Sequence, residues 1–307
     1  MSQEKKVNLF LRLRPLIPIE NILPEEEKSS ILNLNSDNTV TLENNKSFKF
    51  DKIFNIDVPE QEIFTHSTQN LINNAFNGKI CSIICYGYNC TGKTYTMEQI
   101  ISNTMKEIFD SDKSKYTLKI SYFEFYLNEL TDLLGKKTNL VVNENGIKDL
   151  TLLEVKNLEM FNELYTKGKM NRIDIHFGNN KHKMNCKVFN SSSVLTLNIF
   201  KDNNVLLGKI FFIDLGGKTK INSPNGIGFK EGTSLNASLD NFNEVLKSFS
   251  KKENLTFRQD KFLRSIKQCF DKDNYLTFIF HCVNLKRYKN ENLQTLEMSK
   301  FLEKINC

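Results

Sequence analysis

Hydrophobic residues occur in short blocks along the chain, separated by polar segments rich in Asn and Lys. In one set of blocks they are continuous or alternate every second residue, which is typical of strands buried on one or both faces of a sheet. We expect these strands at residues 7–13, 79–86, 117–125, 194–200, 205–214 and 276–283.

In a second set of blocks, hydrophobic residues recur every three or four positions, which is typical of helices that bury one face. We expect these helices at residues 61–76, 94–109, 158–165, 233–249, 258–270 and 293–305. Because helices separate the strands, the pattern predicts an α/β fold with a central, mostly parallel, twisted sheet and helices on both faces. We expect a single domain that spans residues 1–307.

The composition favours a soluble, cytoplasmic protein. Hydrophobic residues make up 39% of the 307 positions, enough for a large core, but no apolar stretch is long enough to span a membrane. The seven cysteines form no C-x-x-C pair, which favours reduced thiols over a disulfide framework. The net charge of +6 suits a partner with an acidic surface, and nucleic acid, tubulin or an acidic protein would all fit.

A glycine-rich segment follows the strand at 79–86 and precedes the helix at 94–109. It has the spacing G-x-x-x-x-G-K-T of a phosphate-binding loop (P-loop) and consists of Gly87, Tyr88, Asn89, Cys90, Thr91, Gly92, Lys93 and Thr94. In such a loop, backbone N–H groups converge on a polyphosphate, the lysine neutralises its β- and γ-phosphates, and the hydroxyl binds Mg²⁺. We therefore expect ATP or GTP, with Lys93 on the phosphates and Thr94 on Mg²⁺.

A second nucleotide signal ends the strand at 205–214. Asp214 is followed three residues later by Gly217, the D-x-x-G pattern with which P-loop NTPases sense the γ-phosphate. We expect Asp214 to hold Mg²⁺ through water and the Gly217 amide to contact the phosphate. The two residues are the candidates for a catalytic role. D-x-x-G is weak evidence by itself, but it gains weight from the P-loop upstream.

Further motifs make the chain resemble the kinesin motor domain family. They occur in the family's order, from R-L-R-P at 12–15 and F-D-K-I-F at 50–54 to G-K-T-Y-T-M at 92–97, S-Y-F-E-F-Y at 121–126, G-K-M-N-R at 168–172, N-A-S-L at 236–239 and F-R-Q-D-K-F-L-R at 257–264. A GTPase or nucleotide-kinase interpretation of the P-loop leaves these motifs unexplained. The resemblance implies a P-loop NTPase fold of kinesin motor type, which binds ATP and Mg²⁺.

The resemblance also implies how the base of ATP is held. Pro15 and Tyr95 would stack on the two faces of adenine, and Arg12 and Arg14 would border the base. From the sequence alone, these two arginines would be interpreted as the charged edge of a strand. Their spacing from Pro15 favours the nucleotide role.

The implied partner is the microtubule, with no nucleic acid or membrane partner. Arg258, Lys261 and Arg264 recur every third residue and match the family's tubulin-contacting positions, although a solvated basic helix face would give the same spacing. Ala237 stands where the family has a lysine, which weakens the match. No sustained heptad pattern predicts a coiled coil, so another motor or an adaptor subunit is a further candidate partner.

The chain departs from the family in both switch segments. The first switch of the family reads N-x-x-S-S-R-S-H-S, and here Val188, Phe189 and Asn190 replace its first two serines and its arginine. Thr219 replaces the glutamate of the second switch that pairs with that arginine. Valine and phenylalanine cannot bind Mg²⁺. Residues 191–193 are serines that could do so after a register shift, but the strand pattern argues against such a shift.

Two functions are therefore open. The first is a kinesin-like motor domain that binds ATP and microtubules and hydrolyses ATP weakly. The second is a non-catalytic kinesin-like module that docks on microtubules or on a partner motor without turnover. The intact P-loop favours nucleotide binding, whereas the altered switches favour weakened hydrolysis.

Overall fold

A central sheet of nine described strands organises the molecule. The computed structural model describes residues 5–43, 45–111, 115–144, 146–177, 190–201, 204–218, 227–257 and 260–306. The sheet order is β11-β7-β12-β13-β6-β14-β1-β5, with β8 paired to β7. The strands are β1 (Val7–Leu13), β5 (Lys52–Phe54), β6 (Ile80–Gly87), β7 (Thr117–Tyr126), β8 (Glu129–Asp132), β11 (Leu153–Val155), β12 (Ser192–Lys201), β13 (Val205–Asp214) and β14 (Tyr275–Cys282).

The sheet has a parallel half and an antiparallel half. Strands β13, β6, β14, β1 and β5 run parallel to one another, whereas β12 pairs antiparallel with both β13 and β7. The two small sheets on the surface are formed by β2 (Leu32–Leu34), β3 (Thr39–Leu42) and β4 (Ser47–Lys49), and by β9 (Val142–Asn143) and β10 (Gly146–Ile147). The strand that leads into the P-loop, β6, lies inside the parallel half, where ligands bind at the carboxyl ends of strands.

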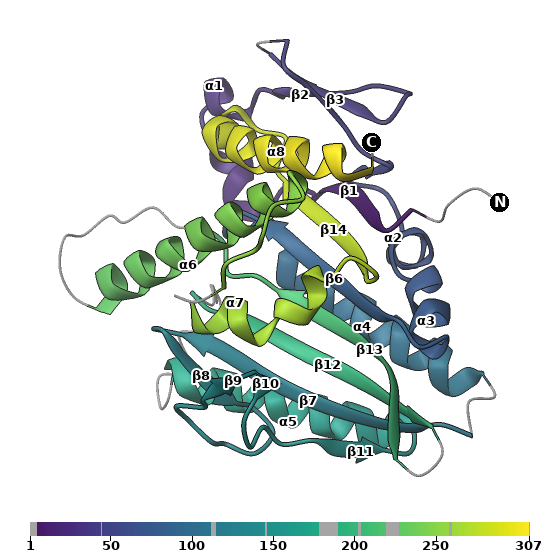
Figure 1. Ribbon diagram of the computed structural model, residues 1–307. Coiled ribbons are helices and arrows are strands. Elements are labelled where there is room, and N and C mark those ends of the chain that lie inside the picture. The colour runs from purple at the N-terminus through teal and green to yellow at the C-terminus, as the bar shows by residue number, and fades with distance from the viewer. Residues whose placement is uncertain are drawn as a thin grey trace.

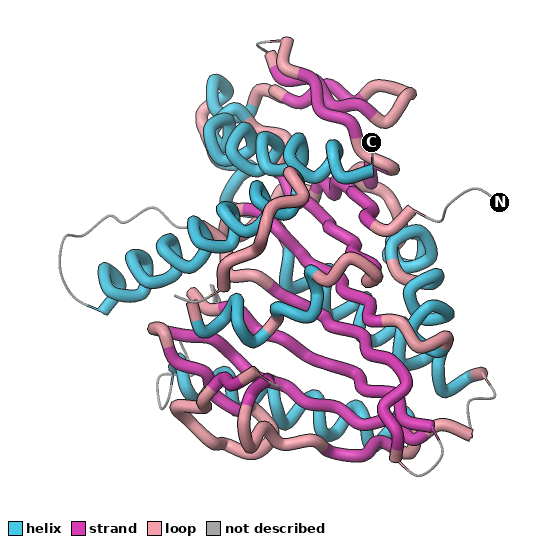
Figure 2. The backbone as a smooth tube through the Cα atoms, in the orientation of Figure 1, coloured by secondary structure: helices cyan, strands magenta, loops and turns pink. Residues whose placement is uncertain are grey.

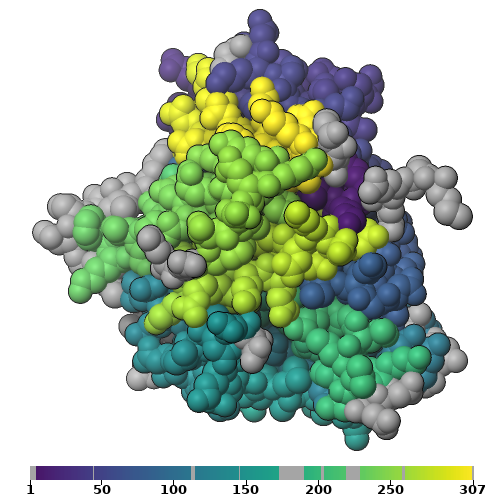
Figure 3. Space-filling view, viewed as in Figure 1, coloured from purple at the N-terminus to yellow at the C-terminus, as the bar shows by residue number. Residues whose placement is uncertain are grey.

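Helices cover both faces of the central sheet (Figures 1 and 2). One face packs against α2 (Glu60–Ser67), α3 (Gln69–Phe76), α4 (Lys93–Asp110) and α5 (Leu158–Phe177). The other face packs against α6 (Ile227–Ser250), α7 (Lys261–Ser265) and α8 (Lys289–Glu303), which fill the centre of the view in Figure 3. Each face has its own hydrophobic cluster, as expected for a sheet buried on both sides. The predicted fold class is confirmed.

Short elements connect these layers. They are α1 (Glu25–Lys28) and the 3₁₀ turns η1 (Pro18–Ile22), η3 (Lys267–Phe270), η4 (Lys286–Tyr288) and η5 (Lys304–Asn306). Among the described residues, no helix has both the length and the apolar character required to cross a bilayer.

All six predicted strands are present, with ends that differ by at most two residues, but several helix predictions need correction. The helices expected at 233–249 and 293–305 begin earlier, at Ile227 and Lys289. The helix expected at 61–76 is interrupted at Thr68, whose φ of −129° is not helical. The helix expected at 158–165 continues to Phe177. The helix expected at 258–270 begins only at Lys261, because extended Asp260 caps it by accepting a hydrogen bond from the Leu263 N–H. A break at Ile266 then separates α7 from η3.

Candidate nucleotide site

The P-loop connects β6 to α4 and leaves the N-terminus of α4 open. Gly87 has a φ of +147°, and a Cβ at this position would lie 2.6 Å from the backbone oxygen of His281 on β14. Gly92 has a φ of +93° and caps α4, which begins at Lys93. Only glycine combines such backbone angles with so close an approach. No side-chain hydrogen bond caps the start of α4, and the N-terminus of a helix favours an anion.

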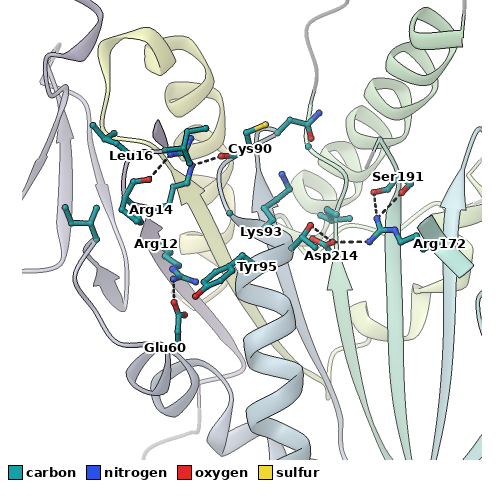
Figure 4. A pocket seen from close by; sticks show the side chains of 18 residues that line it. Arg12, Arg14, Leu16, Glu60, Cys90, Lys93, Tyr95, Arg172, Ser191 and Asp214 are labelled. Carbon is teal, nitrogen blue, oxygen red and sulfur yellow. Dashed lines mark hydrogen bonds and ion pairs between the residues drawn. The ribbon is translucent and has the colours of Figure 1, made fainter. Parts of the chain in front are cut away.

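A pocket of about 550 Å³ lies beside this loop (Figure 4). Its walls come from the end of β1, the P-loop, the start of α4, α5 and the end of β13. The predicted site residues that line it are Arg12, Arg14, Pro15, Asn89, Cys90, Gly92, Lys93, Thr94, Tyr95, Asp214 and Gly217. The predicted residues Gly87, Tyr88 and Thr91 belong to the loop but do not line the pocket. The fold thus brings together three sequence segments that are far apart in the chain.

Both arginines at one end of the pocket are held by buried or partly buried carboxylates. Arg12 pairs with Glu60 at 2.7 Å, and Arg14 pairs with Glu20 at 2.7 Å and donates to the Cys90 backbone oxygen at 2.6 Å. These contacts fix the arginines as walls of the pocket, because a charged group that is buried and paired has little freedom to move.

Aromatic and apolar side chains complete this end. Tyr95 is 55% exposed, and its ring lies 5.4 Å from the Arg12 guanidinium, close enough for a cation–π contact. Pro15, Leu16, Ile17 and Ile56 also line this pocket. A planar base could therefore stack against Tyr95 and contact apolar groups around it.

Charged groups gather at the opposite end, where a polyphosphate would lie. The Lys93 ammonium donates to the Tyr88 backbone oxygen at 2.6 Å, and its burial lowers the pKa of Lys93 to about 8. Thr94 Oγ1 donates to Asp214 Oδ2 at 2.8 Å. The other oxygen of this carboxylate, Oδ1, is buried and has no hydrogen-bond partner among the described residues. A hydroxyl oxygen and a carboxylate with an oxygen to spare are ligands that suit Mg²⁺.

Gly217 lies directly against the P-loop. A Cβ on this residue would lie 2.3 Å from the Asn89 backbone nitrogen and 2.6 Å from Lys93 Nζ. A side chain at position 217 would therefore collide with Asn89 and Lys93 of the P-loop. The D-x-x-G segment reaches the P-loop only because its last residue is glycine.

Arg172 is a site residue that the sequence analysis quoted in a motif but did not assign. It projects from α5 into a buried cluster, where it donates to Glu124 at 2.8 Å and lies 3.5 Å from Asp214 Oδ2 (Figure 4). Burial alone lowers the pKa of Arg172, but the charges of Glu124 and Asp214 outweigh it and the net shift is upward. Glu124 lies 48 residues away in the S-Y-F-E motif, and no signal in the sequence suggested this pair.

Three consecutive serines connect the start of β12 to its surroundings. Arg172 donates to Ser191 Oγ at 2.9 Å and to Ser193 Oγ at 3.1 Å, and Ser192 Oγ accepts from the Gly216 N–H at 3.0 Å. Ser193 pairs with Asp214 across the β12–β13 ladder. The serine hydroxyls are thus used to hold the end of the first switch in place.

Asn190, which replaces the arginine of the family's first switch, contacts two other segments. Its Oδ1 accepts from Asn89 Nδ2 of the P-loop at 3.3 Å, and its Nδ2 donates to Glu231 Oε2 of α6 at 3.1 Å. The replacements Val188, Phe189 and Thr219 lie outside the described residues.

The predicted filament-facing residues are only partly described. Lys261 is exposed in the first position of α7, and Arg264 donates to the backbone oxygen of Val142 in the neighbouring strand β9. Arg258 lies outside the described residues. Ala237 is exposed on α6.

Comparisons with known proteins agree with this geometry. A family model described as "Kinesin motor domain" matches residues 12–305. Kinesin-like protein 3 of Schizosaccharomyces pombe is 25% identical over 94% of this chain and 56% of its own length. Kinesin heavy chain isoform 5C of Homo sapiens is 25% identical over 91% of this chain and 31% of its own length. The chain thus spans between about a third and a little over half of these relatives.

Solved structures show the same fold. One, described as a fast kinesin, superimposes with a TM-score of 0.82 at 23% identity and covers 96% of this chain and 90% of its own. Another is the C-terminal motor and motor homology domain of Kar3Vik1, fused to a synthetic heterodimeric coiled coil. It superimposes with a TM-score of 0.79 at 21% identity and covers 97% of this chain and 85% of its own. Since the family model covers nearly the entire sequence, the chain belongs to the kinesin motor domain family.

Proposed function

We propose that the chain is one motor domain, from 1 to 307, that binds ATP with Mg²⁺ and binds microtubules, and that it hydrolyses ATP weakly. The observation that carries the proposal is the pocket of about 550 Å³ with Lys93, Thr94 and Asp214 at one end and Tyr95 at the other. This order of cationic, oxygen-donor and aromatic groups suits a nucleoside triphosphate.

Each part of the nucleotide would contact a different set of residues in the pocket. Adenine would stack between Pro15 and Tyr95, with Arg12 and Arg14 at its border. The phosphates would accept hydrogen bonds from the N–H groups of the P-loop and would displace the Tyr88 backbone oxygen from the Lys93 ammonium. Mg²⁺ would take the Thr94 hydroxyl directly and Asp214 through water, and would neutralise charge on the phosphates.

Weak hydrolysis follows from the groups that the chain lacks. Phosphoryl transfer depends on positioning of water and on stabilisation of the developing charge. With Asn190 and Thr219 in the two switches, the ion pair that closes the family's site cannot form. The serines at 191–193 offer no replacement, because their hydroxyls contact Arg172 and the Gly216 N–H.

Microtubule binding would use the face of the molecule that carries α7. Lys261 is exposed there, and the net charge of +6 favours an acidic filament. Arg258 and Arg264 would contribute to the same positive surface. A motor domain that binds microtubules would be found on the cytoskeleton in the cytoplasm.

A second candidate is a non-catalytic module that docks on microtubules or on a partner motor. One observation favours it: Asn190 and Thr219 stand where the family has the paired arginine and glutamate of its two switches. The solved Kar3Vik1 structure combines a motor domain with a motor homology domain, so the fold can serve such a pairing in that protein.

Nucleotide binding and steady-state ATPase, each with and without microtubules, separate the two candidates. The proposal expects ATP binding that Lys93→Ala abolishes, microtubule binding, and slow but measurable turnover. Microtubule binding without turnover would support the non-catalytic module. A wild-type protein whose nucleotide affinity equals that of Lys93→Ala would contradict the nucleotide site itself.

A further inference from the structure

The side chain of Asn190 lies between the P-loop and α6. Its amide oxygen accepts from Asn89 at 3.3 Å, and its amide nitrogen donates to Glu231 at 3.1 Å. In the family's sequence pattern the same position is an arginine that pairs with a glutamate of the second switch. Here an uncharged side chain meets an acid that comes from a different place in the chain. We call the row Asn89–Asn190–Glu231 the amide link.

The Glu231 carboxylate is held from two sides. One oxygen accepts from Asn190, and the other accepts from the Tyr126 hydroxyl at the end of β7. Burial and the hydrogen bond to Glu231 both raise the pKa of Tyr126, so this hydroxyl remains a donor. A partly buried carboxylate with two donors is fixed in position more firmly than one in contact with solvent alone.

The two ends of the amide link reach the two candidate binding regions. Asn89 lines the nucleotide pocket and lies against Gly217. Glu231 lies near the start of α6, and further along the same helix Asn241 donates to Asp260, the residue that caps α7 next to Lys261. A helix with one polar contact near its start and another near its middle is a physical route by which one region can influence the other.

We propose that Glu231 is the acidic partner of the first switch in this protein, and that the amide link positions the P-loop and couples it to α6. This inference rests on the proposed function. Glu231 is a positioning residue, since it acts on the nucleotide through Asn190 and Asn89.

The proposal changes what Asn190→Arg should do. From the sequence alone, an arginine at position 190 would lack its partner, because Thr219 replaces the glutamate. With Glu231 Oε2 within 3.1 Å of the present amide nitrogen, a guanidinium at this position has a carboxylate to pair with. Asn190→Arg should therefore strengthen the link, and it should do so only while Glu231 keeps its charge.

The test compares Asn190→Ala, Glu231→Gln, Asn190→Arg and the doubles Asn190→Ala/Glu231→Gln and Asn190→Arg/Glu231→Gln. The matched control is Asn243→Ala, which removes an asparagine of the same helix that accepts from the Tyr86 hydroxyl at 2.9 Å. The readouts are the affinity for fluorescent ATP and ADP, and the factor by which microtubules accelerate ADP release. The melting temperature of every variant shows whether it is folded.

We expect Asn190→Ala and Glu231→Gln each to weaken ATP affinity by up to about tenfold, the factor that matches a lost hydrogen bond to a charged group. They should also remove the microtubule acceleration, and Asn190→Ala/Glu231→Gln should be no worse than either single change, because both break one link. Asn190→Arg should increase the acceleration, and Glu231→Gln should cancel that increase. Asn243→Ala should retain the wild-type acceleration even if it lowers the melting temperature.

Additive effects of Asn190→Ala and Glu231→Gln, or an equal loss of acceleration in Asn243→Ala, would overturn the amide link while leaving the nucleotide site intact. The amide link would also be overturned if Asn190→Arg increased the acceleration of ADP release equally with and without Glu231→Gln. A wild-type protein that binds no nucleotide would instead overturn the proposed function, and the positioning role of Glu231 with it.

Discussion

The Thr94 hydroxyl donates to the Asp214 carboxylate across 2.8 Å, which joins the first turn of α4 to the end of β13. These residues are 120 positions apart in sequence and come from the two motifs that suggested a nucleotide site. They meet because β6 and β13 are parallel neighbours, so that the P-loop and the D-x-x-G segment leave the sheet at the same edge. Both residues line the same pocket, and together they would hold Mg²⁺ there.

The first prediction concerns this contact. Thr94→Val keeps the shape of the side chain but removes the hydroxyl, so Mg²⁺ should lose a direct ligand. We expect affinity for Mg²⁺–ATP to fall on the order of tenfold, while affinity for metal-free ATP changes little. Titrations of fluorescent ATP with Mg²⁺ and with EDTA would measure both values. An equal loss in the two conditions would show that Thr94 does not act through the metal.

A buried histidine predicts how stability depends on pH. His281 lies below the P-loop, where Nε2 is 2.8 Å from Thr96 Oγ1, and burial is the main cause that lowers the pKa of His281 from 6.5 to about 3. Between these values the unfolded chain binds a proton on this residue and the folded chain does not. Its contribution to stability is therefore complete above pH 6.5 and decreases as the pH falls toward 3, by up to about 1.4 kcal/mol per pH unit.

Urea unfolding over this pH range would measure the effect. His281→Gln offers hydrogen-bonding groups without titrating, so it should flatten the dependence relative to wild type. His66→Gln, at an exposed position on α2, is the matched control and should leave the slope as it is. If His281→Gln keeps the full wild-type slope, the acid sensitivity has another origin.

Much of this architecture could be predicted from the sequence because its signals are local. The P-loop spacing, the strand before it and the D-x-x-G segment each occupy a few consecutive residues, and parallel pairing brings them together. The late start of α7 was missed because a single cap decided it. Asp260, which caps α7, looks like any other polar residue within a basic helical pattern.

The role of Arg172 could not be predicted for a different reason. Its partners, Glu124 and Ser191, lie 48 and 19 residues away and come from two different strands or their ends. Nothing in the spacing of these residues indicates that they meet. The same holds for Glu231, whose contact with Asn190 spans 41 residues and has no counterpart in the motif comparison.

The buried Arg172 cluster gives a prediction about stability. Arg172→Met would leave the carboxylates of Glu124 and Asp214 buried without their shared cation, which should cost about 3–5 kcal/mol. Lys169→Met on the same helix removes the partner of Glu98 in a partly exposed ion pair, and should cost less than about 1 kcal/mol. Urea unfolding of both variants gives the comparison. Similar losses in the two would mean that Arg172 is less important to the fold than its contacts indicate.

Microtubule binding should be sensitive to salt and to α7. Arg258→Ala with Lys261→Ala removes two positive charges from the proposed filament face, so co-sedimentation should weaken, and the remaining binding should depend less on ionic strength. The matched control is Lys106→Ala with Lys115→Ala, two exposed lysines on or next to α4, which packs on the other face of the sheet. Equal losses in the two double variants would indicate a general charge effect and not a defined face.

The last prediction concerns turnover. With the switch residues altered, microtubule-stimulated ATPase should lie well below the roughly 1 to 100 s⁻¹ of well-equipped phosphoryl-transfer enzymes. Phe189→Ser, Asn190→Arg and Thr219→Glu together should raise the rate more than the single changes combined, because an ion pair and a metal-binding hydroxyl are useful only when the site can close around both.

The single variants make this expectation sharper. Thr219→Glu alone adds an acid that has no arginine to meet, so it should gain nothing. Asn190→Arg alone has Glu231 within reach and should be tolerated, but this pairing uses the carboxylate of α6 and adds no contact to the second switch. The triple variant should therefore have a higher ATPase rate than Asn190→Arg, because it adds the acid of the second switch and the hydroxyl of the first. A wild-type rate as high as that of the triple variant would show that other groups already complete the site.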